Sequence, residues 1–149
     1  MKISIGADHE GFDLKEQLAK LLRAAGHDVI DVGTHSKEPV DYPDFARAVG
    51  EAILDGRAER GVIVCGSGAG AAIAANKMRG IRAALAHDTY TAHQMVEHDD
   101  ANVCCLGAWV VGPKLAQEVV TVFVNARFSG EERHRRRLAK VEAMEEEGK

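Results

Sequence analysis

Short apolar runs rich in β-branched residues alternate with longer amphipathic stretches along the whole chain, and this alternation constrains the fold more than any other feature. The short runs predict strands, and the stretches that follow them predict helices. Runs without polar alternation are typical of parallel strands that are buried on both faces of a sheet. The expected strands lie within residues 2–8, 28–33, 60–66, 81–87 and 102–111.

Five strands that are each followed by a helix predict right-handed crossovers and one parallel sheet covered on both faces. The fold class expected for the chain is therefore α/β, a doubly wound, Rossmann-like three-layer domain with a five-stranded parallel sheet. The 149 residues have the usual size of one compact unit, so we expect a single domain over residues 1–149. An additional charged C-terminal helix and tail is expected over residues 130–149.

Composition excludes several classes of protein. The net charge of −4 gives no overall attraction to nucleic acid or to an anionic membrane. No apolar run approaches the roughly 20 residues that span a bilayer, and the N-terminal "MKISIGADHEGF" lacks the apolar core of a signal peptide. Three cysteines fit neither a secreted disulfide framework nor a metal finger. We expect a cytoplasmic protein that binds neither nucleic acid nor membrane.

The stretch "VIVCGSGAG" ends the third expected strand in a glycine-rich turn. Gly66, Gly68 and Gly70 allow tight turning and close backbone approach, and the helix that follows offers free N–H groups to an anion. The G-x-G-x-G spacing is a weak dinucleotide fingerprint, and Lys77 lies too far along the chain for a Walker loop. A turn that only packs strand against helix is the structural alternative.

Cys65 stands at the mouth of this turn. A thiol at a strand end beside a helix N-terminus has its thiolate favoured, which points to chemistry. The alternative is a buried core cysteine, which is the interpretation for Cys104 and Cys105. A redox role is disfavoured because no resolving cysteine lies near Cys65 in the sequence.

Polar residues are expected at the carboxyl ends of the strands, where open α/β sheets bind their ligands. His9 and His98 are the histidines of most interest, because each adjoins an acidic residue at an expected sheet edge. His27, His35 and His93 are interpreted as solvated or structural. The polar candidates at this edge are Asp8, His9, Cys65, His87, Asp88, His98 and Asp99.

Arg133 and Arg137 lie four residues apart in the C-terminal helix, so they share one helix face and could grip a phosphate. A solvated basic face, balanced by the acidic "EAMEEE" that follows, is the alternative for this pair.

Several motifs occur together: "GADHEGFDLK", "DYPDFA", "VCGSGAGAAIAANK", "GIRAAL" and "EHDDANV". In this order, over almost the whole chain, they resemble the type B ribose-5-phosphate isomerase family, which includes the galactose-6-phosphate isomerase subunits. The resemblance implies a homodimer or a dimer of dimers, with active sites at the subunit interface. It also implies interconversion of a phosphorylated aldose and ketose without metal or other cofactor.

The resemblance also implies roles for individual residues. Cys65 matches the base that moves a proton between C1 and C2 of the sugar, and His98 matches the residue that opens the sugar ring. Ser67 stands where threonine is more usual and keeps the hydroxyl. The loop that holds the enediolate matches Gly66, Ser67, Gly68 and Gly70; the phosphate contacts match His9, Arg133 and Arg137; the contacts to sugar hydroxyls or the ring oxygen match Asp8 and Tyr42.

Two residues depart from the pattern of the family. Asp99 stands where asparagine is usual, and an ionised carboxylate can only accept hydrogen bonds. Trp109 stands where the family usually has a phosphate-gripping arginine. Both residues are expected to reach the site from the partner subunit, as catalytic or substrate contacts. The alternatives are drift compensated by Arg135 or Arg136, and a shifted substrate.

The predicted function is metal-independent aldose–ketose isomerisation of a sugar phosphate through a cis-enediolate, with Cys65 as base. Ribose 5-phosphate and ribulose 5-phosphate are the expected substrates. The same chemistry on erythrose or erythrulose 4-phosphate, or on allose or galactose 6-phosphate, is the alternative that Asp99 and Trp109 leave open. A non-catalytic metabolite-binding α/β module is the alternative of another class.

Overall fold

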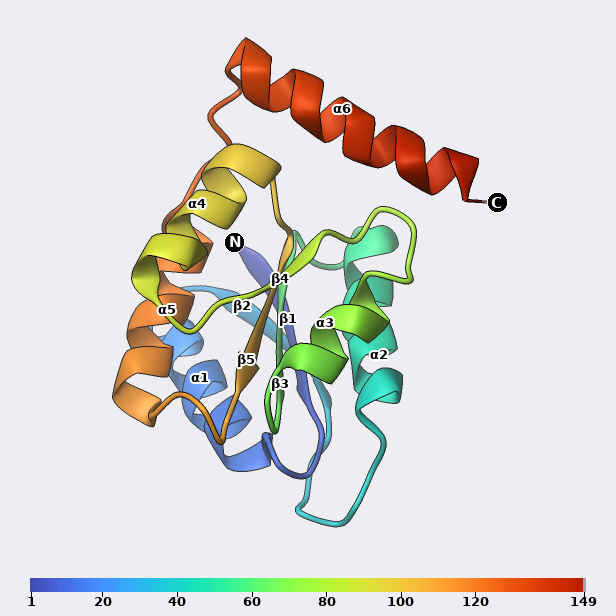
Figure 1. Ribbon diagram of the computed structural model, residues 1–149. Helices are drawn as coiled ribbons and strands as arrows, with labels where there is room; N and C mark the ends of the chain where they lie inside the picture. Colours follow the sequence, from blue (N-terminus) through green and yellow to red (C-terminus); the bar gives the residue numbers. More distant parts are fainter. Residues whose placement is uncertain (149) are drawn as a thin grey trace.

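The computed structural model describes residues 1–148 and contains one five-stranded sheet with six helices (Figure 1). The strands are β1 (Lys2–Ala7), β2 (Asp28–Gly33), β3 (Arg60–Cys65), β4 (Ala83–Leu85) and β5 (Val103–Gly107). The helices are α1 (Phe12–Ala24), α2 (Tyr42–Leu54), α3 (Ala69–Ala75), α4 (Thr89–Asp99), α5 (Pro113–Asn125) and α6 (Glu132–Glu147). The strand order is β2-β1-β3-β5-β4 and every pairing is parallel. The predicted doubly wound α/β class is confirmed.

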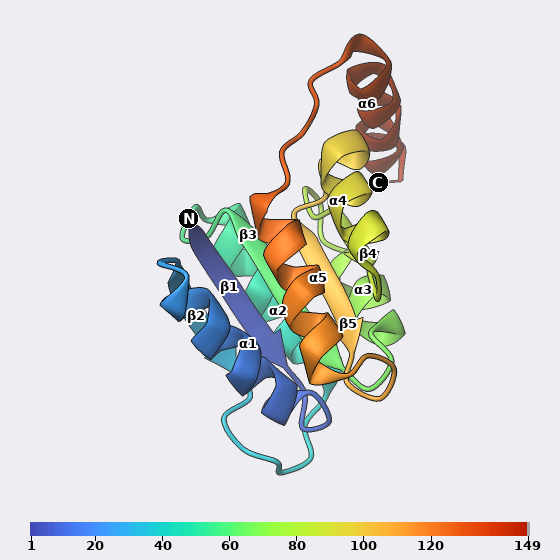
Figure 2. The same ribbon diagram turned by 90° about the vertical axis from the view of Figure 1, so that its left-hand side faces the viewer.

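Helices cover both faces of the sheet. Helices α1, α4 and α5 pack on one face and α2 and α3 on the other (Figures 1 and 2). Val62 and Val64 of β3 join the core on the first face, while Ile63 and Cys65 join the core on the second. Burial on both sides is the physical reason that the central strands lack polar alternation. No helix within residues 1–148 has the length and apolar character of a bilayer span.

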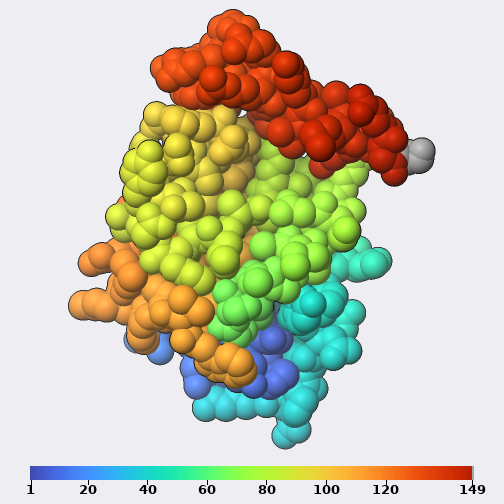
Figure 3. All heavy atoms as spheres, viewed as in Figure 1, coloured from blue at the N-terminus to red at the C-terminus, as the bar shows by residue number. Residues whose placement is uncertain are grey.

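Helix α6 lies across the edge of the sheet where the strands begin, opposite the edge where they end (Figures 1 and 3). Among the helices and strands it contacts chiefly α4. Its C-terminal half also contacts the loop after α3, where Gly80 N–H donates to the Glu145 carboxylate and Arg79 pairs with Glu146. The expected charged C-terminal helix is present, but it continues to Glu147, so the acidic residues belong to the helix rather than to a tail. Lys149, the end of the expected tail, lies outside the described residues.

The last two strands are shorter than the sequence predicts. Strand β4 has three residues, and β5 ends at Gly107, where a strand through residue 111 was expected. Ala108 N–H still donates to the Cys65 carbonyl oxygen of β3 at 2.9 Å. The chain turns there because Val110 N–H donates back to the Gly107 carbonyl oxygen at 3.0 Å, which an extended strand does not allow. The residues expected to extend β5 therefore form a turn beside the end of β3.

A buried ion pair ties α1 to the end of β2. The Lys15 side chain is fully buried, and its Nζ donates to the two carboxylate oxygens of Asp31 at 2.8 and 2.7 Å. Gly33 N–H also donates to Asp31 Oδ1, at 2.9 Å. A buried charge is stable only when it is paired and hydrogen-bonded, so this pair fixes α1 against β2 just below the turn that carries Asp8.

Candidate active site

A pocket of about 360 Å³ opens at the edge where the strands end. The ends of β1 and β3, the start of α2 and the turn after β5 build it. This is the edge at which open α/β sheets bind ligands. Among its lining residues, only Glu10 was absent from the predicted site. The lining consists of Asp8, Glu10, Tyr42, Cys65, Gly66, Ser67, Gly70 and Trp109.

Cys65 is the last residue of β3 and forms the floor of this pocket. Cys65 is only 4% exposed, and Gly68 N–H donates to its Sγ at 3.2 Å. Because an N–H donates to the sulfur, the thiolate form has a hydrogen-bond partner in place. The sulfur, the glycine loop and the pocket thus meet at one point.

The other two cysteines lie within the sheet. Burial raises the pKa of the Cys104 thiol to about 12, and burial together with its sulfur neighbours raises the pKa of Cys105 well above its usual value. Both groups therefore stay as neutral thiols at physiological pH. Their interpretation as core cysteines agrees with their complete burial.

The glycine loop packs closely against the neighbouring strands. Gly68 has φ +81°, a left-handed conformation that glycine adopts without strain. A Cβ added at Gly68 would lie 2.5 Å from Leu85 Cδ1 and 2.8 Å from the Leu106 carbonyl carbon. Ser67 is exposed, and its Oγ accepts a hydrogen bond from Ala69 N–H at 3.2 Å. The backbone of the loop is therefore held in place, while the Ser67 side chain faces the pocket opening.

Tyr42 covers one side of the loop from the first residue of α2. A Cβ added at Gly70 would lie 2.6 Å from Tyr42 Cε1, so the ring rests directly on the glycine. The tyrosine is 39% exposed, which leaves its outer face open to the pocket. Gly70 is thus required for Tyr42 to approach the loop.

The turn after β1 fixes two further predicted residues of this edge. Asp8 Oδ1 accepts hydrogen bonds from Glu10 N–H and Gly11 N–H, both at 3.0 Å. His9 Nδ1 accepts from Val40 N–H at 3.1 Å, which anchors the imidazole to the loop before α2. His9 Nε2 lies 3.3 Å from Glu10 Oε1. Asp8 therefore lines the pocket, and His9 stands beside it.

Trp109 corrects one expectation from the sequence. It was expected to reach the site from a partner subunit, but it lines the pocket of its own chain. Its backbone N–H donates to the Gly66 carbonyl oxygen at 3.0 Å, and its ring lies 3.2 Å from where a Gly66 Cβ would stand. The indole is 74% exposed at the mouth of the pocket. The turn that shortens β5 is the reason for this position.

His98 and Asp99 correct a second expectation, which placed them at the same sheet edge as Cys65. Both residues lie in the last turn of α4. A helix between parallel strands runs back along the sheet, so its C-terminal end lies at the edge where the strands begin. Asp99 lines a groove of about 500 Å³ beneath α6 together with Arg137, away from Cys65.

His98 is held by a residue that sequence reasoning missed. Its ring stacks on the imidazole of His134 in α6, with ring centroids 4.1 Å apart and planes inclined by 24°. His134 is buried, and its Nδ1 is hydrogen-bonded to the Ser129 hydroxyl. Burial is the main cause that lowers the pKa of His134, and the neighbouring His98 and Arg133 lower it further. No local sequence pattern signals this contact between two distant helices.

Arg133 and Arg137 extend from α6 at the same edge as His98. Both are exposed, and Arg133 is paired with Glu131. One chain therefore places the predicted site residues in two groups at opposite edges of its sheet. The edge where the strands end holds the thiol, the loop and Trp109, and the edge where they begin holds the imidazole and the arginines.

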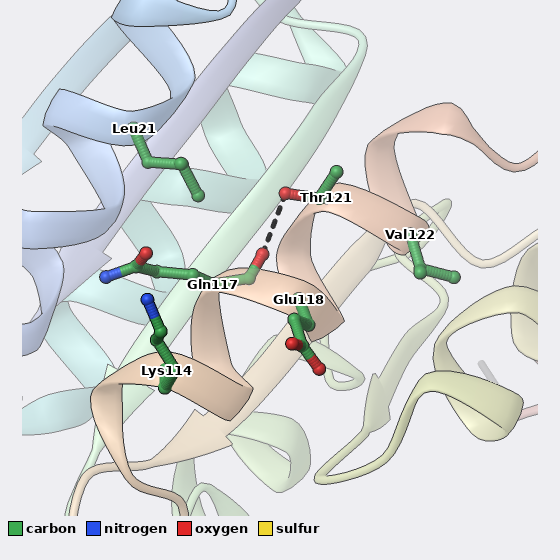
Figure 4. A pocket seen from close by; sticks show the side chains of 6 residues that line it. All are labelled: Leu21, Lys114, Gln117, Glu118, Thr121 and Val122. Carbon is green, nitrogen blue, oxygen red and sulfur yellow. Dashed lines mark hydrogen bonds between the residues drawn. The ribbon is translucent and has the colours of Figure 1, made fainter.

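A further hollow of about 360 Å³ lies between α1 and α5 (Figure 4). Its polar side chains include Lys114, Gln117 and Thr121, whose hydroxyl donates to the Gln117 carbonyl oxygen at 2.8 Å. None of the predicted site residues line it, so it is not the candidate active site. Among residues 1–148, no three His, Cys, Asp or Glu side chains gather in a way that could hold a metal ion.

Comparison with known proteins supports the isomerase rather than the non-catalytic module. The family model described as Ribose/Galactose Isomerase matches residues 3–141. The chain is 41% identical to ribose-5-phosphate isomerase B of Escherichia coli (strain K12) over 97% of each chain. It is 42% identical to D-erythrulose-4-phosphate isomerase of Pectobacterium atrosepticum over 87% of this chain and 86% of that one.

Solved structures give the same result. The structure of Clostridium thermocellum ribose-5-phosphate isomerase B superposes with a TM-score of 0.98 at 46% identity, covering 100% of both chains. The family model spans almost the whole chain, and the relatives named here are more than 40% identical to it. These matches include all five strands of the sheet. The chain therefore belongs to the ribose/galactose isomerase family, and it is an isomerase of the aldose–ketose class.

Proposed function

We propose that this sugar-phosphate isomerase interconverts ribose 5-phosphate and ribulose 5-phosphate through a cis-enediolate, with Cys65 as the base. The observation that carries the proposal is the thiol on the floor of the pocket, with Gly68 N–H donating to its sulfur at 3.2 Å. Membership of a family of aldose–ketose isomerases supplies the reaction class.

The chemistry follows from the arrangement of this pocket. The Cys65 thiolate removes the proton from C2 of the open-chain aldose and returns it to C1, so the same sulfur takes and gives this proton. The hydroxyl proton on O2 passes to O1 of the enediolate, so that the carbonyl group moves from C1 to C2. Negative charge develops on the substrate oxygens in between. Fixed N–H donors near those oxygens stabilise the enediolate because they need no reorganisation during the reaction. Gly66, Ser67, Gly68 and Gly70 supply the loop for this role.

The proposed site requires a second copy of the chain. The Cys65 pocket and the His98 imidazole lie at opposite edges of one sheet, so one chain cannot bring both to one substrate. In a two-fold homodimer, or in a dimer of such dimers, the α6 end of one copy covers the pocket of the other. Exposed apolar side chains on α3, β4 and α4 support such a contact; they are Ile73, Leu85 and Tyr90.

The two edges then have different tasks. His98 of the second copy opens the sugar ring, and Asp99 contacts the sugar beside it. Arg133 and Arg137 of the second copy hold the phosphate together with His9 of the first. Binding the phosphate orients the opposite end of the sugar for proton transfer. Asp8 and Tyr42 contact the sugar hydroxyls or the ring oxygen.

Replacement of Cys65 tests the proposed base. Cys65→Ala should abolish exchange of the substrate C2 proton with deuterated water, while binding of the sugar phosphate stays within about threefold, because binding of remote groups is separable from the chemical step. Cys104→Ala is the matched control, since it removes a buried sulfur from the opposite face of the sheet. Substantial exchange by Cys65→Ala would assign the base to another group, with Asp99 of the second copy the next candidate.

Trp109 favours a second candidate substrate. An indole at the mouth of the pocket presents one neutral donor and a broad apolar face, where a guanidinium would present several charged donors. A shorter substrate, such as erythrose or erythrulose 4-phosphate, fits a pocket end that an indole has narrowed. The relative named D-erythrulose-4-phosphate isomerase supports this alternative. Allose or galactose 6-phosphate is less favoured by the same argument.

A further inference from the structure

His87 follows the end of β4 by two residues and contacts Gly107, the residue against which the Ser67–Gly68 loop packs. Its Nε2 accepts a hydrogen bond from Gly107 N–H at 2.8 Å. The β4–β5 register ends at the pair Leu85–Cys105, and Gly107 is two residues further along β5. The imidazole therefore accepts the hydrogen bond that a backbone carbonyl of β4 would accept if the β4–β5 pairing continued to Gly107.

The hydrogen bond requires Nε2 to be the acceptor nitrogen of the ring. A backbone N–H can only donate, so Nε2 must carry its lone pair and the proton of the neutral imidazole must be on Nδ1. An imidazolium has no acceptor nitrogen and would leave Gly107 N–H without this partner. The adjacent Asp88 interacts with His87 electrostatically, and its pKa is lowered chiefly by its hydrogen bonds to Thr91.

Gly107 supports the catalytic loop by direct backbone packing. A Cβ added at Gly107 would lie 2.5 Å from both the carbonyl carbon and the carbonyl oxygen of Ser67. A Cβ added at Gly68 would lie 3.1 Å from Gly107 N. Gly68 in turn donates its N–H to Cys65 Sγ. The position of Gly107 thus sets the position of the loop relative to the sulfur.

Gly107 also supports the turn that carries Trp109. Its carbonyl oxygen accepts hydrogen bonds from Val110 N–H and Val111 N–H, both at 3.0 Å. The same turn is joined to the loop by the hydrogen bond from Trp109 N–H to the Gly66 carbonyl oxygen. One glycine therefore connects the Ser67–Gly68 loop with the turn that carries the indole.

We propose that His87 is a positioning residue for the isomerisation. By holding Gly107 N–H, its neutral imidazole fixes the backbone on which the Ser67–Gly68 loop and the Trp109 turn rest. His87 does not touch the sugar; it acts through Gly107. The catalytic consequence depends on the proposed role of Cys65, whereas the hydrogen bond and the tautomer do not.

Three variants test this role. His87→Phe keeps a flat ring but removes the acceptor, and His87→Gln keeps an acceptor oxygen on a flexible chain. His93→Gln is the matched control, because His93 is an exposed histidine of α4 whose partner is Glu97. Steady-state kcat and KM are measured for each variant with ribose 5-phosphate, after circular dichroism has shown that each one is folded.

We expect His87→Phe to lower kcat by about tenfold or more, because small displacements of reacting groups are costly, with KM within about threefold. His87→Gln should recover most of kcat, and His93→Gln should match the unaltered enzyme. Unchanged kcat in His87→Phe, or equal losses in the Phe and Gln variants, would overturn the proposal. A rise in KM at constant kcat would also overturn it, because it would indicate a binding role.

A spectroscopic measurement completes the test. It is made on the protein with His87 in place, so it does not depend on whether the His87 variants fold. In protein labelled with ¹⁵N at histidine, His87 should show a lone-pair Nε2 and a protonated Nδ1 at neutral pH. A protonated Nε2 would overturn the proposal. If Cys65→Ala kept its proton exchange, the proposed base would fail, but this measurement would still report on His87.

Discussion

The Trp109 indole lies on the backbone of Gly66, and the Trp109 backbone N–H donates to the Gly66 carbonyl oxygen at 3.0 Å. This contact places an exposed aromatic ring beside the residue that follows the proposed base. We therefore expect the side chain at position 109 to contact the substrate at the mouth of the pocket.

Replacing this indole should change the preference among sugar phosphates. Trp109→Arg is expected to raise kcat/KM for ribose 5-phosphate relative to erythrulose 4-phosphate by about tenfold, because a hydrogen bond to a charged group contributes about 1.5–3 kcal/mol. Trp109→Phe, which keeps an apolar ring, is the control and should leave this ratio nearly unchanged. Equal ratios in all three proteins would show that position 109 does not select the substrate.

Two inactive variants should restore activity when they are combined, if each site uses both sheet edges. Cys65→Ala and His98→Ala are mixed after denaturation and refolded together. Random pairing should give about a quarter of the unaltered activity, because half of the dimers then contain one intact site out of two. Cys65→Ala mixed with Asp8→Asn is the control without recovery, since both changes lie at one edge. No recovery in the first mixture would place the site within one chain.

The buried Lys15–Asp31 pair should be more important for stability than an exposed pair. Lys15→Met leaves the Asp31 carboxylate without its cation, and loss of one partner from a buried pair costs about 3–5 kcal/mol. Lys37→Met, which breaks the exposed pair with Asp13, should cost less than about 1 kcal/mol. Urea unfolding measures both free energies. Equal losses in the free energy of unfolding would contradict the expectation that the buried pair contributes more to stability than the exposed pair.

His134 should make stability depend on pH. Burial lowers its pKa in the folded state, so between that value and the unfolded value of about 6.5 the unfolded chain binds more protons. The free energy of unfolding should therefore fall as pH falls through this range, and His134→Phe should weaken the dependence. Urea unfolding at several pH values measures both slopes, with His93→Gln as the control. The same slope in His134→Phe would contradict the assignment.

Much of the fold could be predicted because periodicity reports local burial. The unbroken apolar run of Val62, Ile63 and Val64 predicts a strand buried on both faces, and the structure places it at the centre of the sheet. The glycines after Cys65 predict a tight turn, and the left-handed Gly68 meets that expectation. These features depend on a residue and its close neighbours in the chain, so the sequence contains them.

The sequence by itself determined the fold class and the presence of a thiol beside a glycine loop. Only the tertiary structure decided which polar residues meet. His98 lies at the edge opposite Cys65 because α4 runs back along the sheet, and Trp109 shares the pocket of Cys65 because β5 turns at Gly107. Such meetings depend on the directions of distant elements and on where strand pairing stops, which local periodicity does not report.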